Sequence, residues 1–279
     1  MKIRVQKDLA WLFSNNSNHY LTPDTYFPGS ISLTNSHNGG TPPGDYSHIT
    51  TIIFDMDGTL IRHTWRLDEI TEALFARFAA DLAPLTHTEF FEVYWPKNED
   101  MWYMMVDGVL DGETAAKYGY VNTLRALGLD EALAGPMVDC WRELVLQEAV
   151  PFDDTLAVLE TLRKRYTTGI LTNGFTGLQR GKINRYNLAD YVDFTLVSEE
   201  AGYHKPAKEV FLKALDLAGD VSPQETLYVG DSLVADIRGA QNAGITPVLM
   251  NPQDDVRPPQ EVIKIRRLGE LLPLLRIGV

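Results

Sequence analysis

Short apolar runs alternate with helical patterns along most of this chain. Brief apolar runs that end in turn residues are typical of buried strands. Such runs lie at 50–55, 167–172, 194–197, 226–229 and 246–250. Apolar residues at three- and four-residue steps predict helices at 156–165, 177–186, 207–218 (opened by Pro206), 233–243 and 268–275. This alternation predicts an α/β fold: a doubly wound parallel sheet with helices on both faces.

A long helical block interrupts the alternation after the first strand. Between residues 63 and 150 apolar positions such as Ile70, Leu74 and Phe78 keep helical spacing, and no segment resembles a strand. We therefore expect a core made of residues 50–62 and 151–279, with an all-helical domain, residues 63–150, inserted into it. Residues 1–49 are rich in Ser, Asn, Thr, Gly and Pro, which predicts a low-complexity N-terminal extension.

Composition narrows the classes of function. The chain has 279 residues, 44% of them hydrophobic, and a net charge of −13. Nucleic-acid and anionic-membrane binding both need clustered Lys and Arg, so we expect no nucleic acid and no membrane as partner. No apolar run reaches the length of about 18 residues that a membrane span needs, and the cluster at 9–13 is too short for a secretory signal. The single cysteine, Cys140, excludes an intrachain disulfide, fits a cytoplasmic protein, and is expected to be a small apolar helix residue.

Polar side chains collect where four of the predicted strands end. They are Asp55 and Asp57 after the first strand, Thr172 and Asn173 at the second, Lys205 in the loop after the third, and Asp231 and Asp236 after the fourth. Each alone has an ordinary explanation as a turn or helix-cap residue. The carboxyl ends of parallel strands, however, meet at one edge of a sheet, where ligands of open α/β sheets bind. We therefore expect these groups to face one site.

This set of residues suits phosphoryl transfer. A phosphoryl group carries negative charge spread over its oxygens, so catalysis depends on positioning and electrostatics. An aspartate can attack phosphorus and form an acyl phosphate, while a second carboxylic acid protonates the leaving alkoxide and later deprotonates water. Mg²⁺ takes few carboxylates together with phosphate and water oxygens, which fits Asp55 and Asp231 with Asp236 close behind. Lys205 and the Thr172 hydroxyl would contact the remaining phosphoryl oxygens.

Four motifs, in this order, resemble those of the haloacid dehalogenase superfamily. They are Asp55-Met-Asp-Gly-Thr-Leu, Leu171-Thr-Asn-Gly, Lys205-Pro and Gly230-Asp-Ser-Leu-Val-Ala-Asp236. The resemblance implies a Rossmann-like sheet with a helical cap of the first type. It also implies a role for each site residue. Asp55 would be the nucleophile and Asp57 the general acid/base, with its backbone carbonyl on Mg²⁺; Thr172, Asn173 and Lys205 would face the phosphate; Asp231 would bind Mg²⁺, and Asp236 would bind it directly or through water.

Asp57 separates the reactions that such a resemblance allows. Hydrolytic dehalogenases lack the second aspartate because a halide leaves without a proton, so Asp57 favours a phosphatase. Sugar-phosphate mutases also keep it and remain the alternative, whereas a non-catalytic module with a relic site would have lost motif residues. Residues 171–179 and 197–206 resemble the pyrimidine 5′-nucleotidase and N-acylneuraminate-9-phosphatase branch. We therefore expect a monomer or homodimer that hydrolyses a small phosphomonoester of nucleotide or sugar type.

Other residues have weaker claims to the site. In the helical block an aromatic and methionine cluster could stack on a base, although packing inside the cap is favoured. Its members are Trp95, Met101, Trp102, Tyr103, Met104 and Met105. His63, at the cap hinge, could meet substrate, but a solvated linker position is favoured. Arg180 and Lys182 are expected on a solvated helix face.

Overall fold

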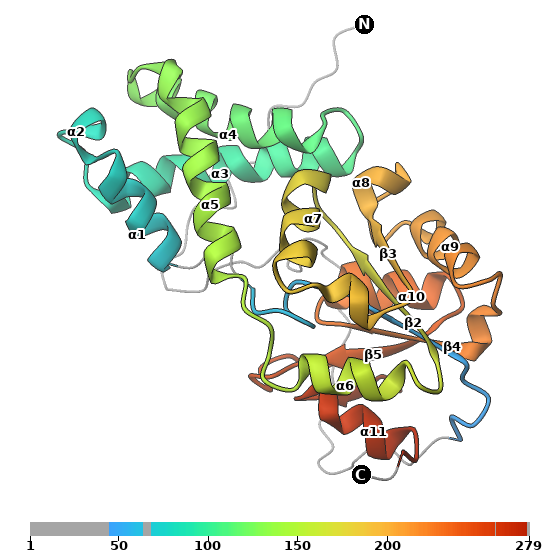
Figure 1. The fold of residues 1–279 in the computed structure, drawn as a ribbon. Coiled ribbons are helices and arrows are strands. Elements are labelled where there is room, and N and C mark those ends of the chain that lie inside the picture. The colour runs from blue at the N-terminus through green and yellow to red at the C-terminus, as the bar shows by residue number, and fades with distance from the viewer. Residues whose placement is uncertain (1–44, 64–67, 260, 278–279) are drawn as a thin grey trace, which may run out of the picture. The chain divides into compact units, whose positions relative to one another are not determined.

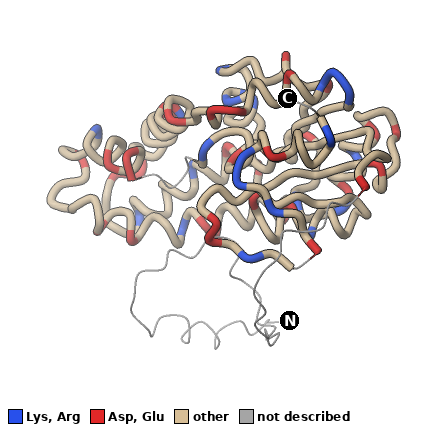
Figure 2. The backbone as a smooth tube through the Cα atoms, turned by 90° about the horizontal axis from the view of Figure 1, so that it is seen from below, with Lys and Arg blue, Asp and Glu red and all other residues tan. Residues whose placement is uncertain are grey.

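The computed structural model describes residues 45–63, 68–259 and 261–277. The predicted N-terminal extension therefore lies almost wholly outside the described residues. All residues that the structure describes belong to one compact unit, residues 38–279. Within them, no helix combines the length and the apolar character that crossing a membrane requires. Figure 2 shows Lys and Arg positions interspersed with Asp and Glu along the backbone.

A six-stranded parallel sheet forms the centre of the fold (Figure 1). Its strands are β1 (Thr51–Phe54), β2 (Thr167–Thr172), β3 (Phe194–Val197), β4 (Thr226–Gly230), β5 (Thr246–Met250) and β6 (Ile263–Ile265). The order is β3-β2-β1-β4-β5-β6, and every neighbouring pair is parallel. The register places Ile53 beside Gly169 of β2 and Tyr228 of β4. Strand β1 is therefore central, and all four of its residues are buried.

Side chains that alternate along the central strand enter separate cores on the two faces of the sheet. Ile52 and Phe54 pack with α6 (Thr155–Leu162) and α11 (Leu271–Leu274). Ile53 points to the other face and packs with α9 (Lys208–Leu217) and α10 (Gly239–Asn242). Helices α7 (Thr176–Arg185) and α8 (Ser198–Ala201) follow β2 and β3. Because helices cover both faces, the strands are continuous apolar runs, as the doubly wound fold predicts.

Between β1 and β2, residues 68–148 form helices and turns without a strand (Figure 1). The elements are α1 (Asp68–Arg77), α2 (Ala79–Leu82), α3 (His87–Val106), α4 (Gly112–Leu127), the 3₁₀ turn Glu131–Leu133 and α5 (Ala134–Glu148). Local signals set the ends: Thr86 and Glu89 form a capping box at the start of α3, and Gly128 ends α4 in the left-handed conformation. The insertion has its own core, which includes Cys140 as the sequence predicts.

The helix predicted at 233–243 consists of two elements. Residues Leu233–Arg238 form a π-helix, and α10 follows it. The Ser232 carbonyl accepts from both the Asp236 N–H at 3.1 Å and the Ile237 N–H at 3.0 Å, which widens the turn. The Asp236 carboxylate also accepts from the Ser232 N–H at 3.0 Å. π-Turns are often found at functional sites, and apolar spacing alone does not distinguish them from an α-helix.

Three further details differ from the sequence prediction. Strand β6 was not predicted, because it has three residues and Lys264 at its centre is exposed. The predicted helix 268–275 is a 3₁₀ turn, Leu268–Glu270, followed by the short α11. Pro206 does not open a helix: it follows a cis peptide bond and precedes Ala207, the N-cap of α9. Short 3₁₀ turns also lie at Leu188–Tyr191 and Pro223–Glu225.

Candidate active site

The predicted site residues stand at the carboxyl ends of three adjacent strands. Asp55 directly follows β1, Asp231 directly follows β4, and Thr172 closes β2. The chain winds from β1 through β2 to β3 on one side and from β4 to β6 on the other, so the strand order reverses between β1 and β4. Open α/β sheets bind ligands at such a point.

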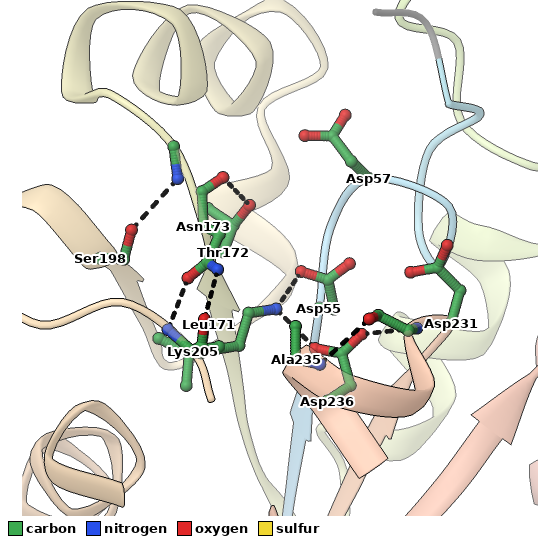
Figure 3. A network of polar contacts seen from close by, with 12 residues as sticks. Asp55, Asp57, Leu171, Thr172, Asn173, Ser198, Lys205, Asp231, Ala235 and Asp236 are labelled. Atoms are coloured by element: carbon green, nitrogen blue, oxygen red, sulfur yellow. Dashed lines mark hydrogen bonds and ion pairs between the residues drawn. The ribbon is translucent and has the colours of Figure 1, made fainter. Parts of the chain in front are cut away.

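Lys205 is the cation that joins the cluster (Figure 3). Its Nζ donates to Asp55 Oδ1 at 2.5 Å, to Asp236 Oδ1 at 2.6 Å and to the Tyr228 hydroxyl at 3.0 Å. The side chain is only 2% exposed. Burial by itself lowers the pKa of a lysine, but the Asp236 and Asp55 carboxylates outweigh it and raise the pKa of Lys205. Lys205 therefore stays charged inside the protein.

Asp236 reaches this cluster because the π-turn directs its side chain inward. Its Oδ1 lies within hydrogen-bonding distance of Lys205 Nζ and of the Tyr228 hydroxyl (3.2 Å), and its Oδ2 accepts from the Ser232 N–H. Gly230 leaves room for the carboxylate, since a Cβ there would lie 2.3 Å from Asp236 Cγ. A carboxylate has about four acceptor positions, so most of those on Asp236 are already used. Asp236 chiefly anchors Lys205.

Three carboxylates of the cluster could together hold a metal ion. One oxygen each of Asp55, Asp231 and Asp236 lies within 4.8 Å of the other two. Two oxygens on one Mg²⁺ are at most about 4.2 Å apart, so a small side-chain adjustment or a bridging water closes the difference. Burial raises the pKa of Asp55 and of Asp231, and the neighbouring carboxylate of Asp236 raises both further. A divalent cation would relieve this repulsion, so the residues present fit Mg²⁺.

Gly58 and His63 border Asp231. Gly58 has a φ of +87°, a conformation that other residues rarely adopt. A Cβ on it would also lie 2.2 Å from Asp231 Oδ2, so both the backbone conformation and the lack of space require glycine here. His63 Nε2 lies 3.4 Å from the same oxygen, with half of its side chain exposed. The solvated position predicted for His63 is therefore observed, and the imidazole also contacts the site.

Thr172 and Asn173 form the neighbouring wall of the site. Thr172 Oγ1 accepts from Gln179 Nε2 at 2.6 Å. The Asn173 side chain donates to the Lys205 carbonyl at 3.0 Å and accepts from the Lys205 N–H at 2.8 Å. This amide therefore holds the backbone of Lys205 in place, and a contact between Asn173 and phosphate stays a prediction.

Asp57 lies on the loop after β1, apart from the ion pairs of Lys205 (Figure 3). Its carboxylate instead contacts α7: Lys182 Nζ lies 2.7 Å from Oδ1 and 2.8 Å from Oδ2, and Gln179 Nε2 lies 2.8 Å from Oδ2. Burial by itself raises the pKa of Asp57, but Lys182, together with His63 and Gln179, outweighs it, and the pKa is lowered. The prediction that Lys182 lies on a solvated face is wrong, because its side chain is 4% exposed.

Sequence reasoning missed Gln179 and Lys182 because α7 has too few apolar residues to show which side is buried. Their i, i+3 spacing places them on one side of the helix. Arg180, on the same helix, instead forms an ion pair with Glu200, with 2.5 Å between Nη2 and Oε2. About a third of the Arg180 side chain is exposed. A positional signal was available, since α7 begins at Thr176, only a few residues after Thr172. The first turns of α7 must therefore lie close to the site.

Residues 49–244, more than half of the chain, match the haloacid dehalogenase-like hydrolase family. The chain belongs to this family. The resemblance drawn from its four motifs is thereby confirmed, and so is its assignment as an enzyme.

Named relatives of this hydrolase include the two types of phosphatase predicted from the sequence. Pyrimidine 5′-nucleotidase YjjG of Escherichia coli is 27% identical over 226 residues, which cover 79% of this chain and 96% of YjjG. The N-acylneuraminate-9-phosphatase of Mus musculus is 38% identical over 105 residues, which cover 38% of this chain and 42% of that enzyme. Among solved structures, the Bacillus subtilis HAD-hydrolase YfnB bound to magnesium has a TM-score of 0.63 at 27% identity, covering 82% of this chain and 99% of that one. The predicted fold class is confirmed.

The aromatic and methionine cluster of the hydrolase's insertion is mostly interior. Met101 and Met105 are buried in the core of the insertion, and Trp95 and Trp102 pack against it. Tyr103 and Met104 are 42% and 43% exposed. Base stacking thus finds no support from four of the six residues, and cap packing accounts for them.

Glu199 links the helical insertion to the sheet-bearing part of the hydrolase. Its Oε1 accepts from the Gly112 N–H, at the start of α4, and its Oε2 from the Thr176 N–H, at the start of α7, both at 2.7 Å. A carboxylate between two helix N-termini is favourable because each presents unpaired N–H groups and a partial positive charge. Phe175 lies beside this link, with its ring 6.1 Å from that of Trp141 in α5. The insertion therefore meets the core next to the turn that follows Thr172.

Gly112→Ala is expected to disturb this link. The added Cβ would lie 1.8 Å from the Phe175 Cβ, and a Cβ cannot move without its backbone, so α4 must shift. We expect overpacking to cost about 1–3 kcal/mol of stability. We also expect kcat/KM to fall about 10- to 100-fold, because small displacements near catalytic groups are costly. Thermal unfolding and phosphatase kinetics measure the two effects.

The matched control is Gly135→Ala in α5, where the added Cβ meets nothing within 4 Å. This variant should keep the wild-type kcat/KM. Equal kinetics for the two variants would contradict the importance of the close contact at Gly112.

Proposed function

We propose that this hydrolase cleaves a small phosphomonoester of nucleotide or sugar-phosphate type, with Mg²⁺ and through an aspartyl-phosphate on Asp55. The observation that carries the proposal is the position of Asp55. It directly follows β1, where the strand order reverses; it accepts a hydrogen bond from the buried Lys205, and it lies beside the carboxylates of Asp231 and Asp236. The relatives named for pyrimidine 5′-nucleotides and N-acylneuraminate 9-phosphate support the same class of substrate.

Asp55 and Asp231 would hold the magnesium ion, together with the backbone carbonyl of Asp57. Asp236, whose acceptor positions are mostly filled, would contact the ion through water. When bound, Mg²⁺ supplies positive charge that offsets the carboxylates and the phosphoryl oxygens. The magnesium bound to YfnB supports the choice of ion.

In the first step Asp55 attacks phosphorus, and the bond between phosphorus and the ester oxygen breaks. Lys205 and the Thr172 hydroxyl would contact the phosphoryl oxygens and offset their charge. In its protonated form Asp57 gives its proton to the departing oxygen, so an alcohol leaves instead of an alkoxide; the ionised form, which the lowered pKa favours, is the one that acts as base in the second step. In the second step Asp57 takes a proton from water, the water oxygen bonds to phosphorus, and the bond to Asp55 breaks. Inorganic phosphate leaves, and Asp55 is regenerated.

Asp57 supports phosphate ester cleavage over dehalogenation. An alkoxide is a poor leaving group without a proton, whereas a halide leaves without one. A partly buried carboxyl two residues after the nucleophile supplies that proton in this chain. The two sequence relatives described above are a nucleotidase and a phosphatase, and among the described residues no contact of the site specifically favours a sugar-phosphate mutase.

A panel of phosphomonoesters tests the proposed function. We expect the purified chain to release inorganic phosphate from one or more nucleoside 5′-monophosphates or sugar phosphates with Mg²⁺. EDTA should slow release by about 100-fold or more, because charge stabilisation by the metal is lost. Halide release from a 2-haloacid and isomer formation from a sugar phosphate are measured in parallel. Phosphate release that EDTA does not affect, or halide or isomer as the main product, would contradict the proposal.

A further inference from the structure

Helix α7 presents two buried polar side chains to Asp57. Gln179 is 2% exposed and Lys182 is 3% exposed. Lys182 Nζ lies 2.7 Å from Asp57 Oδ1 and 2.8 Å from Oδ2, and Gln179 Nε2 lies 2.8 Å from Oδ2. Burying a lysine and a glutamine costs free energy unless both are paired. Their pairing with the carboxylate next to the nucleophile therefore calls for a functional explanation.

The donors fill the two oxygens of Asp57 unequally. Each carboxylate oxygen has about two acceptor positions. Oδ2 accepts from both Lys182 and Gln179, so its positions are full, whereas Oδ1 accepts from Lys182 alone. Among the described contacts of Asp57, one position therefore remains open, and it is on Oδ1.

Gln179 also connects Asp57 to Thr172. The same Nε2 lies 2.6 Å from Thr172 Oγ1 and 3.0 Å from the Asn173 carbonyl. Because Thr172 Oγ1 accepts from Gln179, its own hydrogen remains to be donated. The only acceptor recorded for it among the described residues is the Asn173 carbonyl at 3.4 Å, a long and weak hydrogen bond. A phosphoryl oxygen can therefore displace it.

We propose that Lys182 and Gln179 are positioning residues that fix the Asp57 carboxyl with Oδ1 toward the reacting oxygen, so that proton transfer in both steps runs through Oδ1. This inference rests on the proposed phosphatase function. In the first step the proton moves from Asp57 Oδ1 to the ester oxygen as the phosphorus–oxygen bond breaks and the phosphorus–Asp55 bond forms. In the second step Oδ1 takes a proton from water as the water oxygen bonds to phosphorus and the phosphorus–Asp55 bond breaks.

A purely structural explanation exists and makes a different prediction. Lys182 could serve only to balance the charge of the partly buried Asp57 carboxylate, in which case its loss would slow every substrate equally. A positioning role instead concerns proton transfer to the leaving group. Loss of Lys182 should then lower kcat/KM most for substrates whose leaving group needs a proton.

The experiment compares kcat/KM for 4-nitrophenyl phosphate, phenyl phosphate and an alkyl phosphate, whose leaving groups need increasing help from a proton. Alcohol release completes the first step, so kcat/KM reports that step. For Lys182→Met we expect a loss of about 100-fold or more on the alkyl phosphate and less than about 10-fold on 4-nitrophenyl phosphate, because general acid catalysis contributes on this scale. Lys182→Arg, which keeps the cation, should recover most of the alkyl phosphate activity.

Two further variants complete the design. Arg185→Met is the matched control, because Arg185 is an exposed cation on the same helix, and the ratio between substrates should not change. Gln179→Met keeps the ion pair and should show a smaller loss of the same selective kind, so it serves if Lys182→Met does not fold. Equal losses on aryl and alkyl phosphates in these variants would overturn the positioning role.

Asp55→Asn separates this failure from failure of the proposed function. If Asp55→Asn is inactive while Lys182→Met and Gln179→Met lose both substrates equally, the phosphatase mechanism stands and the positioning role of α7 falls. If Asp55→Asn retains the wild-type rate, the proposed mechanism falls, and this inference falls with it.

Discussion

Replacing Asp55 with asparagine is expected to lower kcat for every phosphomonoester by at least about 10⁴-fold, the scale seen when a covalent nucleophile is removed. Asparagine has nearly the same shape, but its amide is too weak a nucleophile to form the acyl phosphate. The site around it should otherwise persist, because Lys205 keeps its contacts with Asp236 and Tyr228. The effect is measured on 4-nitrophenyl phosphate and on the best substrate of the panel.

A fold measurement must accompany the kinetics of Asp55→Asn. We expect its thermal midpoint in EDTA to stay within a few degrees of wild type. Mg²⁺ should raise the wild-type midpoint, since a ligand that binds only the folded state stabilises it, and should raise that of Asp55→Asn less. Asp153→Asn, the same change at an exposed position, is the control and should match wild type in both assays. Hydrolysis of phosphomonoesters by Asp55→Asn at the wild-type rate would contradict the aspartyl-phosphate mechanism.

Lys205→Met is expected to damage both activity and stability. Lys205 is buried between Asp55 and Asp236, and removing one partner of a buried ion pair typically costs about 3–5 kcal/mol. For a domain of this size that loss corresponds to a fall in thermal midpoint on the order of 10 °C in EDTA. The rate of phosphate release should also fall strongly, because the phosphoryl oxygens lose the positive charge of Lys205 that would offset their negative charge.

The stability loss in Lys205→Met should depend on pH. Burial raises the pKa of Asp55 while Lys205 opposes the rise, so removing Lys205 raises this pKa further above the unfolded value of about 3.9. A group whose pKa is raised by folding favours the folded state below its unfolded pKa, and this contribution is lost as pH rises through the folded pKa. In EDTA the difference from wild type should therefore be larger at pH 8 than at pH 5.

Mg²⁺ and a control lysine complete the test of Lys205. Mg²⁺ should restore part of the lost midpoint, because a divalent cation replaces the missing charge between the carboxylates. Lys208→Met removes an exposed lysine at the start of α9 and should leave the midpoint unchanged. A Lys205→Met variant as stable as wild type at pH 8 in EDTA would contradict the ion-pair account.

Much of the candidate site could be predicted because strand ends converge. Asp55, Thr172 and Asp231 each directly follow or close a strand that the apolar pattern identifies, and parallel strands end at the same edge of a sheet. The positions of these residues therefore follow from the strand assignments. Their chemical roles, the monomeric or dimeric state and the cytoplasmic location stay predictions.

Other features lay beyond the reach of residue patterns. Asp236 enters the cluster through a π-turn, which shares its apolar spacing with an α-helix. Asn173 looked like a phosphate contact, but its amide pairs with the backbone of Lys205, 32 residues away. Lys182 looked solvated on a helix with few apolar residues, yet it meets Asp57 across 125 residues of sequence.

The sequence by itself determined the order of the first five strands and of most helices between them, the helical insertion after β1, and the family, because these depend on local patterns and short motifs. Only the tertiary structure decided which polar groups are buried and what each of them contacts. Burial and pairing arise between segments far apart in the chain, so no local pattern records them. That is why Asp55, Asp57 and Lys205 could be found from the sequence, while Lys182, the lysine that holds Asp57, could be identified only once β1 and α7 were folded together.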